Sequence, residues 1–109
     1  MDRDVDTTRA AKIAKLNDRF RSMAVDVIVT KGVIHGVPDI VGLLKKIEQF
    51  NDFNADNDPH GEHDFGSLSW HRQLIFWKID YYEGEHQFWC DPLSPECKRV
   101  MTVMLAEEY

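Results

Sequence analysis

A β-hairpin predicted over residues 65–81 constrains the fold of this 109-residue chain more than any other feature. Two runs of strand-forming residues, Phe65–Trp70 and Gln73–Tyr81, are separated by only two residues. Between Leu74 and Trp77 every residue is apolar, so we expect the second strand to be central and covered on both faces. The chain is therefore expected to build a mainly antiparallel sheet.

The segments around the hairpin predict three helices and one short strand. Apolar residues recur at helical spacing in residues 6–23, in residues 38–50 and after the Ser94 cap. Residues 25–30 are rich in β-branched side chains, which predicts a short strand. The order α-β-α-β-β-α indicates an α+β fold, a small sheet packed by helices. The apolar face of the last predicted helix is Cys97, Val100, Met101, Met104 and Leu105.

Length and composition limit the chain to one domain, residues 1–109, with residues 1–5 flexible. A chain of 109 residues with 43% hydrophobic residues has room for a single core. No apolar run approaches the ~20 residues that a membrane helix needs, and the charged start does not match a secretory signal. We therefore expect a cytoplasmic location and no membrane contact.

Cys90 and Cys97 are the two cysteines of the chain. In a cytoplasmic protein we expect reduced thiols, because disulfides are rare there. Their spacing is not a standard zinc spacing. Cys97 also falls on the apolar face of the last predicted helix, which favours a packing role.

Charge divides the chain into a basic and an acidic part. Residues 1–46 carry nine Lys or Arg against six acids, whereas residues 47–109 carry four against thirteen, a net −9. Two stretches, 47–71 and 79–97, contain acids but no Lys or Arg between their ends. If they lie side by side they create a negative face that attracts basic proteins or cations and repels nucleic acid. Ordinary solubilising charge is the alternative explanation.

These acidic stretches predict a surface that binds a protein partner with a basic surface. Aromatic residues near 81–89 resemble a base-stacking platform, but the acids around them would repel phosphates, so direct nucleic-acid binding is not expected. The candidate partner-binding residues are Asp56, Asp58, Glu62, Glu83 and Glu85, with Phe53, Phe88 and Trp89 as apolar anchors.

The same loop offers candidate metal ligands, namely His60, Glu62, His63 and Asp64. Imidazole and carboxylate suit zinc, manganese or iron, but the spacing matches no helical zinc motif. Residues 52–63 also begin like a calcium loop, yet lack its central Gly and final Glu. The competing structural explanation is that His63 and Asp64 hydrogen-bond across the loop. We therefore expect no cofactor and keep a divalent metal as the alternative.

Three motifs resemble an uncharacterised domain-of-unknown-function family of alphaproteobacterial plasmids, prophages and integrated elements. They are Asn-Asp-Pro-His-Gly-Glu-His-Asp-Phe-Gly at 57–66, Phe-Trp-Lys-Ile-Asp-Tyr-Tyr at 76–82 and Met-Leu-Ala-Glu-Glu-Tyr at 104–109. The resemblance runs from the first helix to the C-terminus and assigns no activity or residue roles. It implies an accessory protein of a mobile element, a setting in which small acidic proteins often bind restriction or CRISPR complexes.

The expected function is accordingly that of a non-enzymatic interaction protein whose acidic loops dock on a basic surface. The resemblance implies an anti-defence inhibitor, anti-CRISPR or anti-restriction, as one form of it. Two alternatives stay open: a small metal-dependent enzyme or metal-binding domain centred on residues 60–64, and a structural accessory domain without a separate site.

Overall fold

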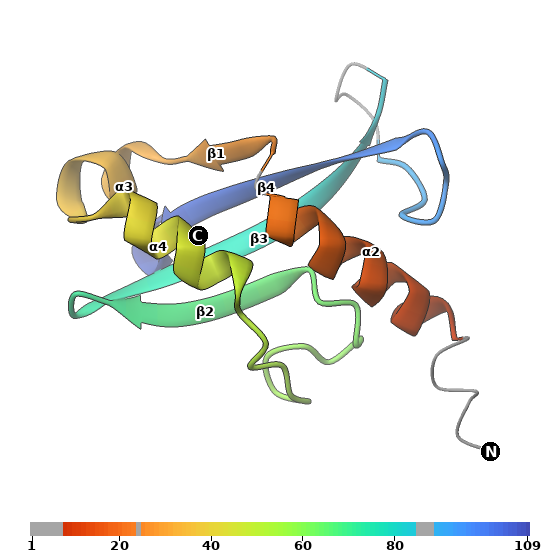
Figure 1. Ribbon diagram of the computed structural model, residues 1–109, viewed down its shortest axis with the longest axis horizontal. Coiled ribbons are helices and arrows are strands. Elements are labelled where there is room, and N and C mark those ends of the chain that lie inside the picture. Colours follow the sequence, from red (N-terminus) through yellow and green to blue (C-terminus); the bar gives the residue numbers. More distant parts are fainter. Residues whose placement is uncertain (1–7, 24, 85–88) are drawn as a thin grey trace.

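The computed structural model describes residues 8–23, 25–84 and 89–109. Residues 1–5, which the sequence predicts to be flexible, lie outside these ranges. The described residues form helices and a four-stranded sheet, which confirms the α+β fold (Figure 1). The elements are α2 (Arg9–Met23), β1 (Val27–Val29), α3 (Lys31–Gly36), α4 (Ile40–Glu48), β2 (Phe65–Trp70), β3 (Gln73–Glu83), β4 (Cys97–Leu105) and the 3₁₀ helix η1 (Ala106–Glu108).

The predicted hairpin is confirmed and forms one edge of the sheet. The strand order is β1-β4-β3-β2, with β1 parallel to β4 and the other pairs antiparallel. Trp70 pairs with Gln73, and the two residues between them, His71 and Arg72, have φ angles of 49° and 71°. Left-handed backbone at both turn positions is the geometry that matches the twist of a two-residue hairpin.

The predicted last helix is wrong, because residues 97–105 form the strand β4. Their apolar spacing fits a helix locally, but β4 lies between β1 and β3 and hydrogen-bonds to both. The alternate residues Met101 and Val103 are buried against the helices. Pairing with two strands distant in sequence therefore outweighs the local pattern.

The predicted middle helix is confirmed as α4, and a short additional helix, α3, precedes it. α3 was not predicted; the Thr30 hydroxyl caps it by accepting a hydrogen bond from the N–H of Val33. α4 begins after Asp39, which has a φ of 53° and accepts from the N–H of Gly42 at 3.1 Å. As expected, its buried face includes Leu43 and Ile47. No helix in the described ranges is both long and apolar enough to cross a bilayer.

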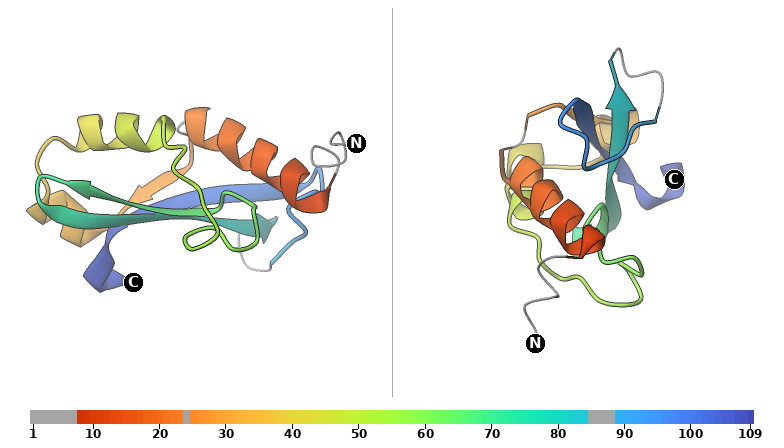
Figure 2. Two further views of the ribbon diagram at one scale, coloured as in Figure 1. Left: turned by 90° about the horizontal axis from the view of Figure 1, so that it is seen from below. Right: turned by 90° about the vertical axis from the view of Figure 1, so that its right-hand side faces the viewer.

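The helices α2 and α4 cover one face of the sheet (Figure 2, left). On that face Ile75 and Trp77 of β3 are completely buried. The neighbouring Leu74 points to the opposite face and is 52% exposed. β3 is central, as expected, but its second face is only partly covered: Phe76 packs against Phe65 and Tyr109, whereas no described helical layer lies over Leu74.

Arg21 joins α2 to the end of α4 from within the core. Arg21 is 3% exposed, and its side chain donates to the carbonyls of Ile47 at 3.0 Å and Phe50 at 2.8 Å. The guanidinium also lies 4.9 Å from the ring centroid of Trp77. These contacts hold the chain that leaves α4 against α2, and the Ile47 carbonyl also accepts from the N–H of Phe50 at 3.1 Å.

Cys90 and Cys97 form a disulfide, with Cα atoms 5.8 Å apart, so the expected free thiols are not found. The start of β4 returns beside the loop that precedes it, which brings the two cysteines together. Cys90 is 9% exposed and belongs to the core cluster. The predicted role of Cys97 in helix packing is also wrong, because Cys97 begins the strand β4 and not a helix.

Candidate binding site

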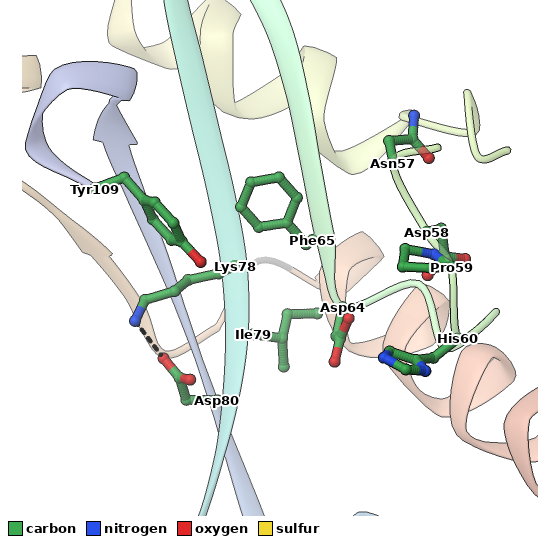
Figure 3. Close-up of a pocket in the computed structure, with 10 residues that line it drawn as sticks. All are labelled: Asn57, Asp58, Pro59, His60, Asp64, Phe65, Lys78, Ile79, Asp80 and Tyr109. Atoms are coloured by element: carbon green, nitrogen blue, oxygen red, sulfur yellow. Dashed lines mark ion pairs between the residues drawn. The ribbon is translucent and has the colours of Figure 1, made fainter. Parts of the chain in front are cut away.

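A cavity of about 370 Å³ opens between the loop 57–60 and the sheet (Figure 3). The loop residues lie on one side of it, Tyr109 and Lys78 on the other, and Asp64 and Phe65 between them. Its polar lining comprises Asn57, Asp58, His60, Asp64, Lys78, Asp80 and Tyr109. Residues from three distant segments of the chain therefore meet at one opening.

The loop is held in shape by its own amide side chains. The Asn54 side chain accepts from the N–H groups of Asp56 and Asn57 at 2.8 and 3.1 Å. The Asn57 side chain accepts from the N–H of Asn54 and donates to the carbonyl of Asp52. These local bonds explain why a run of turn formers adopts a definite conformation here.

Aromatic packing and His63 attach this loop to the core. The Phe53 ring contacts Trp77 edge-on and stacks on the His63 ring, with centroids 3.8 Å apart. The ring nitrogen Nδ1 of His63 lies 2.9 Å from a carboxylate oxygen of Asp18 on α2. The backbone N–H of His63 donates a hydrogen bond to the Asp58 carboxylate. The Asp58 side chain is only 6% exposed. Phe53, Asp58 and His63 thus hold the loop together.

Asp64 lies between the cavity and a buried polar network. Its carboxylate accepts from the Tyr81 hydroxyl at 3.4 Å, and that hydroxyl accepts from the Asn17 amide at 2.8 Å. Asn17 is fully buried; it also donates to the carbonyl of Glu62 and accepts from Arg99 at 2.6 Å. The predicted hydrogen bonding across the loop is confirmed for His63, which bonds to Asp58, whereas the Asp64 side chain bonds to Tyr81 of β3.

Sequence reasoning missed Asn17, although a signal was present. Asn17 lies four residues after Ile13 and three before Phe20, which puts an amide on the apolar face of α2. A polar residue at a core position requires hydrogen-bond partners. Arg99 carried no such signal, because residues 97–105 were expected to form a helix.

The cavity has an excess of negative charge. Burial raises the pKa of the Asp64 carboxyl, and the nearby Asp58 carboxylate adds to the rise. Burial, and then the charge of Asp64, raises the pKa of Glu62 in the same way. Lys78 pairs with Asp80 at 3.2 Å, so its ammonium group is already neutralised. A cation entering here would meet carboxylates that lack sufficient counter-charge.

The two acidic stretches meet at the cavity, where Asp80 lies with Asp58 and Asp64, but Glu83 lies apart from the loop. The loop 51–64 lies below β2 in Figure 1, whereas the end of β3, which carries Glu83, lies at the top, and the right-hand view of Figure 2 also separates them. Asp56 and Glu83 are exposed and Glu62 is half-buried. Trp89 is 69% exposed. Glu85 and Phe88 lie outside the residues that the structure describes.

The four candidate metal ligands point to different surroundings. His63 contacts Asp18 and Asp58, whereas His60 lines the cavity together with Asp64. Within the described ranges, no group of three or more His, Cys, Asp or Glu residues is arranged to hold a metal ion.

A family model described as "Protein of unknown function (DUF3768)" matches residues 11–108. This chain belongs to the DUF3768 family. The match includes α2, the loop and the sheet strands, so the cavity is built almost entirely from the DUF3768 region. It confirms the expected relationship to a domain of unknown function. No curated protein and no solved structure matches the chain.

Proposed function

We propose that this DUF3768 protein is a non-enzymatic binding protein that receives a basic side chain of a partner protein in the cavity at Asp64. The observation that carries the proposal is the charge of the lining. Asp58, Asp64 and Asp80 all contribute carboxylates, and the Lys78 ammonium is paired with one of them. An arriving cation would supply the missing counter-charge and lower the cost of ionising Asp64.

The carboxylates and aromatic rings that line the cavity favour arginine as the side chain that enters. A guanidinium binds a carboxylate through two parallel hydrogen bonds and stacks on aromatic rings. Phe65 and Tyr109 line the same cavity, and their ring centroids are 5.8 Å apart. Asp52 and Asp56 are exposed on the adjoining loop, where their charge can speed the approach of a basic surface.

Calorimetric titration with a hexa-arginine peptide tests this proposal. Asp64→Asn should weaken binding about tenfold, because it removes the least compensated carboxylate of the site. The matched control is Glu96→Gln, which changes the net charge equally at an exposed position outside the cavity. Binding should also weaken as salt rises. If both variants weaken binding equally, the protein attracts the peptide by overall charge and the cavity is not the site.

The mobile-element setting that the three motifs imply suggests a class of partner. We propose that the partner is a defence complex with a basic nucleic-acid channel, supported by the resemblance of the three motifs and by the net charge of −9 on residues 47–109. Affinity purification from a natural host, with wild type and Asp64→Asn in parallel, tests this. Recovery of such a complex with wild type alone supports the proposal, and equal recovery with both contradicts it.

The alternative of a metal-dependent enzyme rests on one observation, that His60 and Asp64 line the same cavity. Imidazole and carboxylate suit transition metals. Elemental analysis of the purified protein distinguishes the two proposals. About one tightly held ion per chain, lost in His60→Ala, would favour the enzyme; arginine-peptide binding that survives chelation would favour the binding protein.

A further inference from the structure

The strand β4 extends beyond its neighbour β1 at one edge of the sheet. β1 pairs only with Met101–Val103, whereas β4 begins at Cys97 (Figure 1). The N–H of Met101 donates to the carbonyl of Asp26, and strand alternation places the N–H and C=O of Arg99 on the same side. Asp26 has a φ of 42°, at the point where the chain turns from α2 into β1. The described sheet therefore has no strand beside residues 97–100.

Two cavities lie at this edge, one on each face of the sheet. The first, about 350 Å³, lies on the helical face and is lined by Leu16, Phe20, Met23 and Val25. The second has a volume of about 440 Å³ and lies on the opposite face of the sheet. The strand pairings place its lining residues Ile28, Tyr82, Val100 and Thr102 on that face. Asp26 lines both cavities.

Large apolar side chains are exposed around the same edge. Met23, Val25 and Ile28 are 56%, 50% and 54% exposed. A single exposed apolar residue is ordinary, but several beside an unpaired strand edge are typical of an interaction site. The helical-face cavity also has basic groups, since Arg19 and Arg99 line it against one acid, Asp26. Lys98 borders it as well, but strand alternation turns the Lys98 side chain toward the opposite face.

We propose that residues 25–28 and 97–100, the β4 edge, bind an extended segment of a partner protein by strand addition. The backbone of the segment would pair with the open groups of Arg99, and its successive side chains would enter the two cavities alternately. The basic lining of the helical-face cavity selects a segment that carries acidic residues among apolar ones. This site is separate from the Asp64 cavity and has the opposite charge preference.

The probe is an acetylated, amidated peptide of sequence Val-Glu-Val-Thr-Val-Glu, in parent form and in two forms N-methylated at odd or at even positions. In ¹⁵N NMR titration the parent should shift the signals of Arg99, Met101 and Val25. Only alternate N–H groups of a strand face its neighbour. One methylated form should therefore bind about tenfold more weakly, and the other nearly as the parent does. No binding of the parent at millimolar concentration, or equal binding of the two methylated forms, overturns the proposal.

A pair of variants locates the site. Val25→Glu should weaken binding of the parent peptide about tenfold by placing an anion in the acid-binding cavity. Val41→Glu is the matched control, because Val41 is 68% exposed on α4 and lines neither cavity. Asp64→Asn should leave binding of this peptide unchanged, which separates this proposal from the previous one. A wild-type dimer that Val25→Glu dissociates would show that a second copy occupies the edge, and would overturn the partner-segment proposal.

Discussion

The fold changes the ionisation of Asp64, an acid that borders the cavity. Its pKa is raised above the ordinary value of 3.8 by burial and by the Asp58 carboxylate. An acid with a higher pKa in the folded than in the unfolded state holds its proton more tightly when folded. Its contribution to stability is therefore present below the unfolded pKa, and it is lost as pH rises toward and through the folded pKa.

Comparison of wild type with Asp64→Asn isolates this effect. As pH rises from about 3 to about 7, the free energy of unfolding of wild type should fall relative to that of the variant. Urea denaturation of both proteins measures the difference, and the NMR titration of the Asp64 carboxyl carbon gives its pKa directly. A difference that grows in favour of wild type would show that the folded state stabilises the carboxylate.

His63 and His60 differ in role although they lie three residues apart. His63 stacks on Phe53 and contacts Asp18, whereas His60 is exposed. His63→Asn should lower the free energy of unfolding by about 2 kcal/mol through loss of the stacked ring and its contact with a carboxylate. Asparagine tolerates the left-handed backbone at this position, where φ is 57°. His60→Asn is the control and should change stability by less than about 0.5 kcal/mol; equal losses would contradict the assignment.

At the scale of elements, β2 and β3 approach closely because Gly66 lies opposite Trp77. A Cβ at Gly66 would lie 2.5 Å from atoms of the indole, which is completely buried and cannot move aside. Gly66→Ala should therefore lower the free energy of unfolding by about 2 kcal/mol or more. The tryptophan emission should also shift, since the environment of Trp77 changes.

Gly36→Ala provides the control for this prediction. Gly36 is at the end of α3, and a Cβ there would meet no atom within 4 Å. Its free energy of unfolding should stay within about 0.5 kcal/mol of wild type. Backbone entropy alone would make either Gly→Ala variant slightly more stable. Comparable losses at both glycines would therefore contradict the assignment of the effect to the approach to Trp77.

At the scale of the whole molecule, the segment before β4 is attached at several points. The disulfide joins Cys90 to Cys97, Asp91 pairs with Arg9 of α2 at 2.7 Å, and Arg99 donates to the carbonyl of Pro92 at 2.8 Å. The Arg9–Asp91 pair is exposed, so it contributes little. The disulfide is therefore expected to be the strongest of these attachments.

Reduction with a thiol reagent should lower the free energy of unfolding by about 2 kcal/mol, the amount expected for a short closed loop. Thermal denaturation with and without reductant measures the change. The double variant Cys90→Ala, Cys97→Ala should be as unstable as reduced wild type and insensitive to reductant. Alkylation of both thiols in untreated protein would show that the bond does not form in that preparation.

Local patterns in the sequence were sufficient for the elements that depend on neighbouring residues. The hairpin follows from two strand-forming runs around a two-residue turn, and α2 and α4 follow from apolar spacing and the polar residues that precede them. In the candidate site, the sequence singled out Asp58, His60 and Asp64 because they crowd one loop. These inferences needed only the chain within about ten residues of each position.

Contacts between distant segments decided the rest. Residues 97–105 have a spacing that suits a helix, but the hydrogen bonds of β1 and β3 make them a strand. The cavity needs Lys78, Asp80 and Tyr109, which no local pattern connects to the loop. The sequence by itself determined the chemistry of each segment, whereas the tertiary structure decided which segments meet, because burial and strand pairing are shared between residues far apart in the chain.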